Sequence, residues 1–179
     1  MSVIMTHTKM MIDPLKAGSE KLRIRDIAHA LSLLCRANGH FPHFYSVGQH
    51  SLLCAQEAKA RGYSRRVQLG CLLHDASEAY LSDVTRPIKP HLPEYLAAEA
   101  RLQGMIYEKW ITPILTEKEE ALIREIDDAI LHVEFLTMMG HAIYDPAPTL
   151  ASQPSFDFVM FEEIEAAFLE AFEELTDRI

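Results

Sequence analysis

The chain has 179 residues, with 17 Lys+Arg against 26 Asp+Glu, 49% hydrophobic residues and a formal net charge of −9. This size and composition predict one globular domain with its own core, and the negative charge argues against a protein that binds duplex nucleic acid through its phosphates. The sequence contains no apolar run near the roughly 20 residues of a membrane helix, no pattern of a secretory signal, and three cysteines without a CxxC pair. We therefore expect a cytoplasmic protein without a membrane partner.

Two parts of the chain are predicted to differ in order. Residues 1–20 are expected to be loosely ordered, whereas residues 21–179 form the predicted domain. Within that domain apolar residues recur with helical spacing, and no stretch alternates with the period of a strand. We therefore expect an all-α fold, a single bundle of five or six helices. The helices are predicted at about residues 23–38, 46–61, 64–75, 93–110 and 116–139, and at the C-terminus.

Local signals set the ends of several of these helices. Ser46 and Ser64 are suited to N-cap positions, and Thr116 opens a capping box. The dipeptide Asn38-Gly39 is a stop signal for the first helix. Loops or short turns are predicted at residues 40–45, 76–93 and 145–155.

The C-terminal segment carries an apolar stripe bordered by acidic residues. A stripe with this spacing packs either on the core of its own domain or on a partner. Its members are Phe161, Ile164, Phe168, Phe172 and Leu175.

The dipeptide His74-Asp75 directly follows an apolar helical run at residues 69–73. A charged pair in such a place is costly unless its members are paired or bind a metal. His50 lies in another predicted helix with apolar neighbours. Two imidazoles and a carboxylate on neighbouring helices suit a borderline divalent ion, with a further carboxylate to balance its charge. The alternative is that His74-Asp75 is an isolated pair and His50 a core histidine, without a ligand role.

The predicted helix at 116–139 offers that further carboxylate. Around the helix axis, at 3.6 residues per turn, Asp127 lies about 90° and Asp128 about 170° from the centre of the apolar face. Asp127 therefore lies at the edge of the buried face, and Asp128 points to solvent. We predict Asp127 as the ligand.

The order of these residues resembles the HD-domain metal-dependent phosphohydrolase superfamily, over roughly residues 23–140. The sequence HDASEAYLSDVTRPIK, at residues 74–89, is similar to the bacterial 5'-deoxynucleotidase branch, where an HDxSE run precedes an Asp and a Pro-containing loop. YSVGQHS, at 45–51, resembles the helix of the first histidine in that group. IREID, at 123–127, resembles the helix of its last aspartate.

The resemblance implies that His50, His74, Asp75 and Asp127 hold one divalent metal ion. Water and a substrate phosphate oxygen would complete its coordination. Its identity is open among Mn, Fe, Co, Ni and Zn, since two histidines and two carboxylates suit them all. A bound dication lowers the pKa of water and polarises a phosphoryl group, so the implied reaction is hydrolysis of a phosphoester.

Three more residues receive roles from the resemblance. Arg36 stands at nearly the family's distance before the first histidine and would grip the substrate phosphate, unless it only caps the end of its helix. Glu78 and Asp83 match the acids of the HDxSE…D run and would orient water and exchange protons, unless they are solvated loop acids. Lys89 is expected to add positive charge at the mouth of the site.

The expected substrate is a small nucleotide, a (deoxy)nucleoside 5'-monophosphate. A dNTP triphosphohydrolase on the same fold is one alternative, although a triphosphate calls for more cations than Arg36, Arg86 and Lys89. A nucleotide-sensing HD module without turnover and a plain helical interaction domain are the others. In the better-known deoxynucleotidases a tryptophan follows the arginine; here Ala37 stands in that place, which leaves the sugar preference open.

The resemblance and the acidic, amphipathic C-terminal stripe together predict a homodimer. Its interface would form by helix packing.

Overall fold

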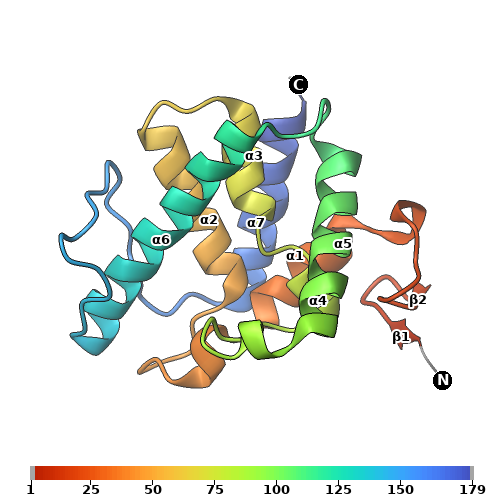
Figure 1. Ribbon diagram of the computed structural model, residues 1–179, viewed down its shortest axis with the longest axis horizontal. Coiled ribbons are helices and arrows are strands. Elements are labelled where there is room, and N and C mark those ends of the chain that lie inside the picture. Colours follow the sequence, from red (N-terminus) through yellow and green to blue (C-terminus); the bar gives the residue numbers. More distant parts are fainter. Residues whose placement is uncertain (1–2, 178–179) are drawn as a thin grey trace.

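The computed structural model describes residues 3–177 and is built mainly of α-helices, as Figure 1 shows. The all-α prediction is confirmed. None of the helices within the described residues combines the length and the apolar composition that a membrane span needs. The α-helices are α1 (Ile24–Leu33), α2 (Val47–Ala60), α3 (Arg65–Leu73), α4 (Glu78–Leu81), α5 (Pro93–Trp110), α6 (Glu117–Met139) and α7 (Phe161–Thr176). The shorter elements are the strands β1 (Ile4–Met5) and β2 (Met11–Ile12) and the 3-10 turns η1 (Ser19–Lys21), η2 (Arg36–Gly39) and η3 (Lys89–His91).

Three helices begin at the capping residues predicted for them. Ser46 caps α2 and Ser64 caps α3, each with a side-chain oxygen that accepts from the backbone N–H three residues later. Thr116 and Glu119 form the complete capping box of α6. These caps satisfy N–H groups that have no partner inside the helix, so they fix where each helix starts.

The first helix is shorter than predicted, because α1 ends at Leu33 and not at Asn38. The chain then forms the separate turn η2, in which Ala37 and Asn38 adopt left-handed backbone angles, with φ of 52° and 50°. Such angles cost a non-glycine residue about 1 kcal/mol. This break takes Arg36 off the helix, so Arg36 does not cap its C-terminal end.

Helix α2 occupies the centre of the bundle, packed on α3, with α6 and α7 against this pair (Figure 1). Two glycines allow these helices to pack closely on their neighbours, Gly48 of α2 against α1 and α7, and Gly70 of α3 against α6. A Cβ on Gly48 would lie 3.0 Å from a side-chain carbon of Ile164 and 3.1 Å from the Leu31 backbone, and a Cβ on Gly70 would overlap the side chain of Ile123. Both sites of close packing lie within one or two turns of a predicted metal ligand, so they fix the backbone from which those ligands project.

The C-terminal stripe packs on the core of its own domain. Ile164, Phe168 and Phe172 are buried, and α7 lies against α1 and α3. Of the two arrangements that the sequence allowed, this one leaves the stripe unavailable to a second copy. The stripe therefore gives no support to the predicted homodimer.

The N-terminal segment, expected to be loosely ordered, forms an antiparallel β1–β2 hairpin in which Ile4 pairs with Ile12. Buried Asp26 on α1 binds its turn: Asp26 accepts from the backbone N–H of Thr8 at 2.6 Å and from the Thr8 hydroxyl at 2.9 Å. Ile12 is fully buried. Part of the segment 3–20 thus forms a hairpin held against α1, while residues 1–2 lie outside the described part.

The long loop after α6 is attached to α2 by one buried carboxylate, Glu57. Its oxygens accept from the backbone N–H groups of Ala151 and Ser152, from the Ser152 hydroxyl, and from Arg61 at 2.6 Å. Burial alone would raise the pKa of Glu57, but these hydrogen bonds outweigh burial and hold the pKa below its ordinary value. The charged form of Glu57 therefore fixes the loop.

Replacing Glu57 by alanine is expected to lower the free energy of unfolding by about 3 kcal/mol, because Arg61 and the loop donors lose a buried acceptor. Since the pKa is lowered in the folded protein, this contribution is present above the ordinary carboxyl pKa of about 4.3 and is lost as the pH falls through the folded-state value. Urea unfolding of the wild type and of Glu57→Ala at about pH 7 and about pH 3 measures how far their difference in free energy of unfolding shrinks as the pH falls. Glu125→Ala is the matched control, since Glu125 also binds Arg61 but is exposed; it should change stability by no more than about 0.5 kcal/mol. An equal loss in both variants would contradict the role of Glu57.

Candidate metal centre

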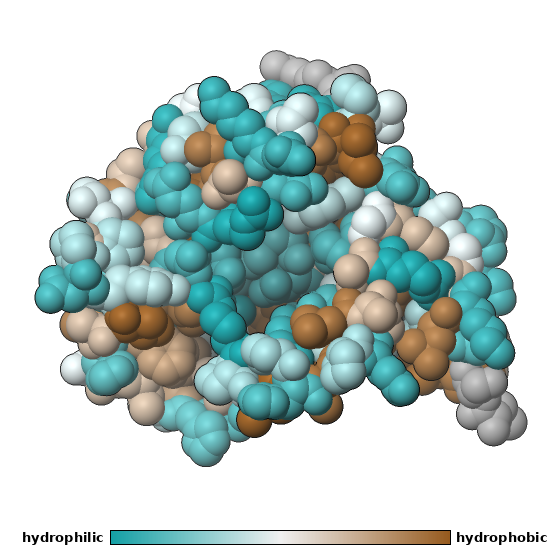
Figure 2. Space-filling model, in the orientation of Figure 1, coloured by the Kyte–Doolittle hydropathy of each residue, from teal (hydrophilic) through white to brown (hydrophobic). Residues whose placement is uncertain are grey.

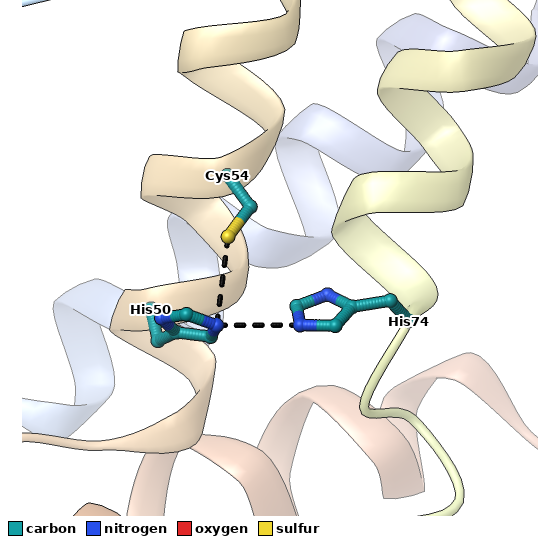
Figure 3. A group of neighbouring side chains, drawn as sticks. All are labelled: His50, Cys54 and His74. Carbon is teal, nitrogen blue, oxygen red and sulfur yellow. Dashed lines mark hydrogen bonds between the residues drawn. The ribbon is translucent and has the colours of Figure 1, made fainter. Parts of the chain in front are cut away.

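His50, Cys54 and His74 form a buried group that can hold a metal ion (Figure 3). His50 and Cys54 lie one turn apart on α2, and His74 is the residue that ends α3. The two histidine Nε2 atoms are 3.2 Å apart, and the Cys54 sulfur lies 3.5 Å from Nε2 of His50. The close packing of α2 on α3 thus brings together two imidazoles that are separated by 24 residues.

The partners of the other ring nitrogens determine which atoms face the centre. Nδ1 of His74 donates to the Cys71 carbonyl at 2.7 Å, and Nδ1 of His50 donates to a carboxylate oxygen of Glu134 at 2.6 Å. A carbonyl and an ionised carboxylate only accept, so Nδ1 carries the hydrogen in both rings. In the neutral imidazoles the two Nε2 lone pairs then face each other, which is an arrangement that favours a cation between them.

The predicted carboxylate ligands lie at the same point. Asp127 Oδ1 is 3.1 Å from His50 Nε2 and 3.7 Å from His74 Nε2. Asp75 Oδ2 is 3.3 Å from His74 Nε2 and 4.0 Å from His50 Nε2. The side chain of Asp127 is 22% exposed and that of Asp128 is 46% exposed, as the position of each on the helix predicted. All four predicted ligands therefore converge.

The chemistry of these donors fits a divalent metal of the borderline class, with nitrogen and oxygen ligands. Cys54 is the further donor nearby, but burial raises the pKa of its thiol well above the ordinary value. A bound metal ion would itself lower that pKa, so Cys54 stays a candidate ligand beside the carboxylates.

The charges at the centre favour a bound cation. Burial alone would lower the pKa of His74, but Asp75 and Asp127 outweigh burial and raise it well above the ordinary value. Burial alone would raise the pKa of Asp127, but the two facing imidazoles hold it well below its ordinary value. The carboxylates thus stay ionised and attract positive charge to the Nε2 atoms.

Glu134 is a central residue that the sequence interpretation missed. It is fully buried on α6 and accepts hydrogen bonds from His50 Nδ1 at 2.6 Å, Tyr45 Oη at 2.7 Å and Arg36 Nε at 3.1 Å. Burial alone would raise its pKa, but His50 and Arg36 lower it to about 2. Glu134 lies seven residues after Asp127, so the two carboxylates share one face of α6. That spacing was the signal in the sequence that could have indicated Glu134.

Arg36 joins the same network from the turn η2. Its guanidinium lies 3.3 Å from Asp75 Oδ2 and 3.6 Å from Asp127 Oδ1, in addition to its bond with Glu134. The predicted anion-binding residue is therefore held next to the predicted metal ligands by three carboxylates.

A cavity of about 380 Å³ opens beside the centre, and most of the predicted site residues line it. We call it the site cavity. Its volume is within the range of small-molecule binding sites. Its polar lining includes Arg36, Asp75, Glu78, Asp83, Lys89 and Asp127, and its apolar lining includes Leu131, Phe135 and Ile143.

The two predicted acids line the site cavity, Glu78 at the start of α4 and Asp83 in the loop after it. Glu78 is buried, with Oε1 accepting from Lys89 at 3.2 Å and Oε2 without a partner among the described residues. Burial, together with the charges of Asp75 and Asp83, raises the pKa of Glu78 to about 9. Burial also raises the pKa of Asp83. The preceding residue, Ser82, has a strained left-handed backbone, with φ of 75°.

Arg86 also binds the centre through a ligand carboxylate. It donates to Asp127 Oδ2 at 2.9 Å, to Asp128 Oδ1 at 2.6 Å and to the Tyr144 hydroxyl at 2.9 Å. Its side chain is 53% exposed. The residues 82–88 thus cross the edge of the site cavity with a cation beside Asp127.

The centre also borders a second cavity, of about 400 Å³, between α5 and α6. His74 and Asp127 line it together with Gln103 and Tyr107 of α5. Figure 2 shows a hydrophilic hollow on this face of the molecule. Asp127 therefore lines both cavities.

Comparisons with known proteins place the chain among relatives whose roles are not known. No family model matches it. It is 40% identical over 98 residues to the uncharacterized protein YfdR of Escherichia coli (strain K12), a match that covers 55% of this chain and 52% of YfdR. The chain thus spans about half the length of that relative. It is 32% identical over 136 residues to the uncharacterized protein RCAP_rcc00048 of Rhodobacter capsulatus, which covers 72% of this chain and 69% of the relative. The chain therefore belongs to the same protein family as RCAP_rcc00048.

Proposed function

We propose that this protein is a divalent-metal-dependent phosphohydrolase that removes phosphate from (deoxy)nucleoside 5'-monophosphates. The observation that carries the proposal is the convergence of two Nε2 atoms and two carboxylates beside a cavity that also contains an arginine and two acids. Metal ligands, an anion-binding cation and proton-exchanging groups are the parts that phosphoester hydrolysis needs. The resemblance of residues 23–140 to the HD-domain superfamily supports the same reaction.

The four ligands His50, His74, Asp75 and Asp127 would hold the metal ion. When bound there, it supplies a Lewis acid for the phosphoryl oxygens and makes water more acidic. Glu134 holds the ring of His50 in the orientation that presents Nε2. The positive guanidinium of Arg36, next to the ligands, attracts and orients the phosphate group.

The acids of the site cavity provide the proton balance. Water adds to phosphorus while the ester P–O bond breaks, so the attacking water loses a proton and the leaving oxygen gains one. Glu78 is placed to deliver that proton, since Lys89 occupies Oε1 and Oε2 is free of partners among the described residues. Asp83 lines the same cavity and is placed to orient the attacking water and to accept the proton that this water loses.

The composition of the site cavity favours a monophosphate. Leu131, Phe135 and Ile143 form an apolar wall suited to a nucleobase. The cations that line the cavity are few, namely Arg36, Arg86 and Lys89, and a triphosphate calls for more positive charge than a monophosphate. The triphosphohydrolase alternative is therefore an outcome of the test below.

A substrate panel tests the proposal. The purified protein is incubated with nucleoside mono-, di- and triphosphates in the presence of Mn, Co, Ni, Zn or Mg, and orthophosphate and triphosphate are detected separately. Orthophosphate release from monophosphates would support the proposal. Release of triphosphate would replace it by the triphosphohydrolase alternative, and binding of nucleotide without turnover would replace it by a sensor.

Replacing Glu78 by glutamine is expected to lower kcat by about 10²–10⁴-fold, the usual contribution of a general acid. Metal content and KM should change little, because Glu78 is not among the ligands. Asp83→Asn is the matched comparison, since it removes the other acid of the cavity. Steady-state kinetics with metal-loaded protein measures both variants. An unchanged kcat in Glu78→Gln would show that Glu78 is not the general acid.

A further inference from the structure

A second group of potential metal ligands lies outside the centre, where the N-terminal hairpin meets two helices. It consists of His7 in the β1–β2 turn, His29 on α1 and Glu165 on α7, and its donor atoms lie within 4.8 Å of one another. His29 Nδ1 is 2.8 Å from a carboxylate oxygen of Glu165, and the rings of His7 and His29 stack with centroids 3.8 Å apart. In Figure 1 the hairpin lies on the side of the molecule away from the C-terminal part of α6.

The position of His7 is fixed by its neighbour in sequence. Thr8 is bound twice by the buried carboxylate of Asp26, through its N–H and its hydroxyl. Asp26 precedes His29 by three residues, so both lie on one face of α1. The two bonds to Asp26 thus place the turn, and with it the imidazole of His7, over the ring of His29.

The third ligand is held by the packing of α7. Glu165 follows Ile164, which is buried and packs closely against Gly48 of α2. The side chains of His29 and Glu165 are 30% and 23% exposed, so both are accessible to an ion from solvent. Three segments far apart in sequence therefore present two imidazoles and a carboxylate at one partly exposed point.

We propose that His7, His29 and Glu165 form a second metal site, specific for a borderline divalent ion such as Zn²⁺, with water in the remaining positions. Two histidines and one carboxylate are a known ligand set for zinc. None of the three residues belongs to the catalytic machinery proposed above. A metal ion here joins the hairpin to α1 and α7, and so contributes to stability by binding only the folded chain.

Metal content tests this site independently of any activity. Untagged protein, stripped with chelator, is dialysed against Zn²⁺ and its bound metal is measured by mass spectrometry. The wild type is expected to bind two equivalents, His29→Ala one, and His29→Ala/Asp127→Asn none. His141→Ala is the matched control, an exposed histidine outside the cluster, and should bind as the wild type does.

A thermal shift gives the second measurement. Zn²⁺ is expected to raise the melting temperature of Asp127→Asn, which keeps the second site, but not that of His29→Ala/Asp127→Asn. The conservative variant Glu165→Gln, in place of His29→Ala, should also lower metal content. Equal zinc in the wild type and His29→Ala, or an equal shift in the two Asp127 backgrounds, would overturn the proposal.

Discussion

Replacing Asp127 by asparagine is expected to weaken metal binding at the centre by at least about 100-fold and to remove metal-dependent phosphate release. Asparagine keeps the shape of the side chain, but it removes the negative charge that lies 3.1 Å from His50 Nε2. Equilibrium dialysis with Mn²⁺ or Zn²⁺ and an orthophosphate assay measure the two effects. The loss of both together would identify Asp127 as a ligand.

Asp128→Asn is the matched control for this prediction. The two aspartates are adjacent on α6 and both bind Arg86, so the control removes one negative charge from the other ion pair of the same arginine. Asp128 is 46% exposed and is bound by Arg86 and Tyr144, away from the two Nε2 atoms, so its replacement should leave metal content unchanged. Equal losses of metal binding and phosphate release in the two variants would mean that Asp127 acts through its ion pair with Arg86 and not as a metal ligand.

Replacing Glu134 is expected to have the largest effect on stability. Glu134→Ala leaves Tyr45, His50 and Arg36 without their buried acceptor, and should lower the free energy of unfolding by about 3–5 kcal/mol. Denaturant unfolding measures this loss. Glu134→Gln keeps one oxygen acceptor and should fold, but it no longer fixes the hydrogen on Nδ1 of His50.

Glu134→Gln therefore separates positioning from folding. As a residue that acts through His50, Glu134 should set metal affinity, and its replacement should lower that affinity by about 10–100-fold. Tyr45→Phe is the matched control, because it removes a different partner of Glu134 and leaves the bond to His50 in place. Wild-type metal affinity in Glu134→Gln would show that Glu134 serves the fold alone.

The choice of Asp127 as a candidate ligand was possible because helical periodicity carries information about faces. The apolar pattern of α6 distinguished Asp127 from Asp128, and the structure confirms the difference in exposure. The same reasoning extended by two turns places Glu134 near the same face as Asp127. Periodicity does not show which partners an acid has, and the bonds of Glu134 to Tyr45, His50 and Arg36 become visible only in the structure.

Other contacts depend on loops, whose conformation leaves little trace in sequence. The left-handed angles of Ala37 and Asn38 end α1 early and turn Arg36 toward the ligands, whereas Asn38-Gly39 indicated only that the helix stops. The bond between Arg86 and Asp127 depends in the same way on the path of residues 82–88. Neither contact follows from spacing or periodicity.

The N-terminal hairpin was missed for a related reason. Its strands have two residues each, too few for a period to be recognised. The hairpin is held by tertiary contacts, above all the bonds of Thr8 to Asp26 and the burial of Ile12. Such contacts cannot be inferred before the helices that supply them are placed.

We propose that this centre uses a metal ion to hydrolyse a nucleotide phosphoester. The most direct test is orthophosphate release from a deoxynucleoside 5'-monophosphate by chelator-stripped protein as Mn²⁺ or Co²⁺ is added back, with Asp127→Asn in parallel. We predict release that begins with added metal, saturates as the centre fills, and is missing in Asp127→Asn. Protein that fills the centre with metal and yet releases no phosphate from any nucleotide would contradict the account.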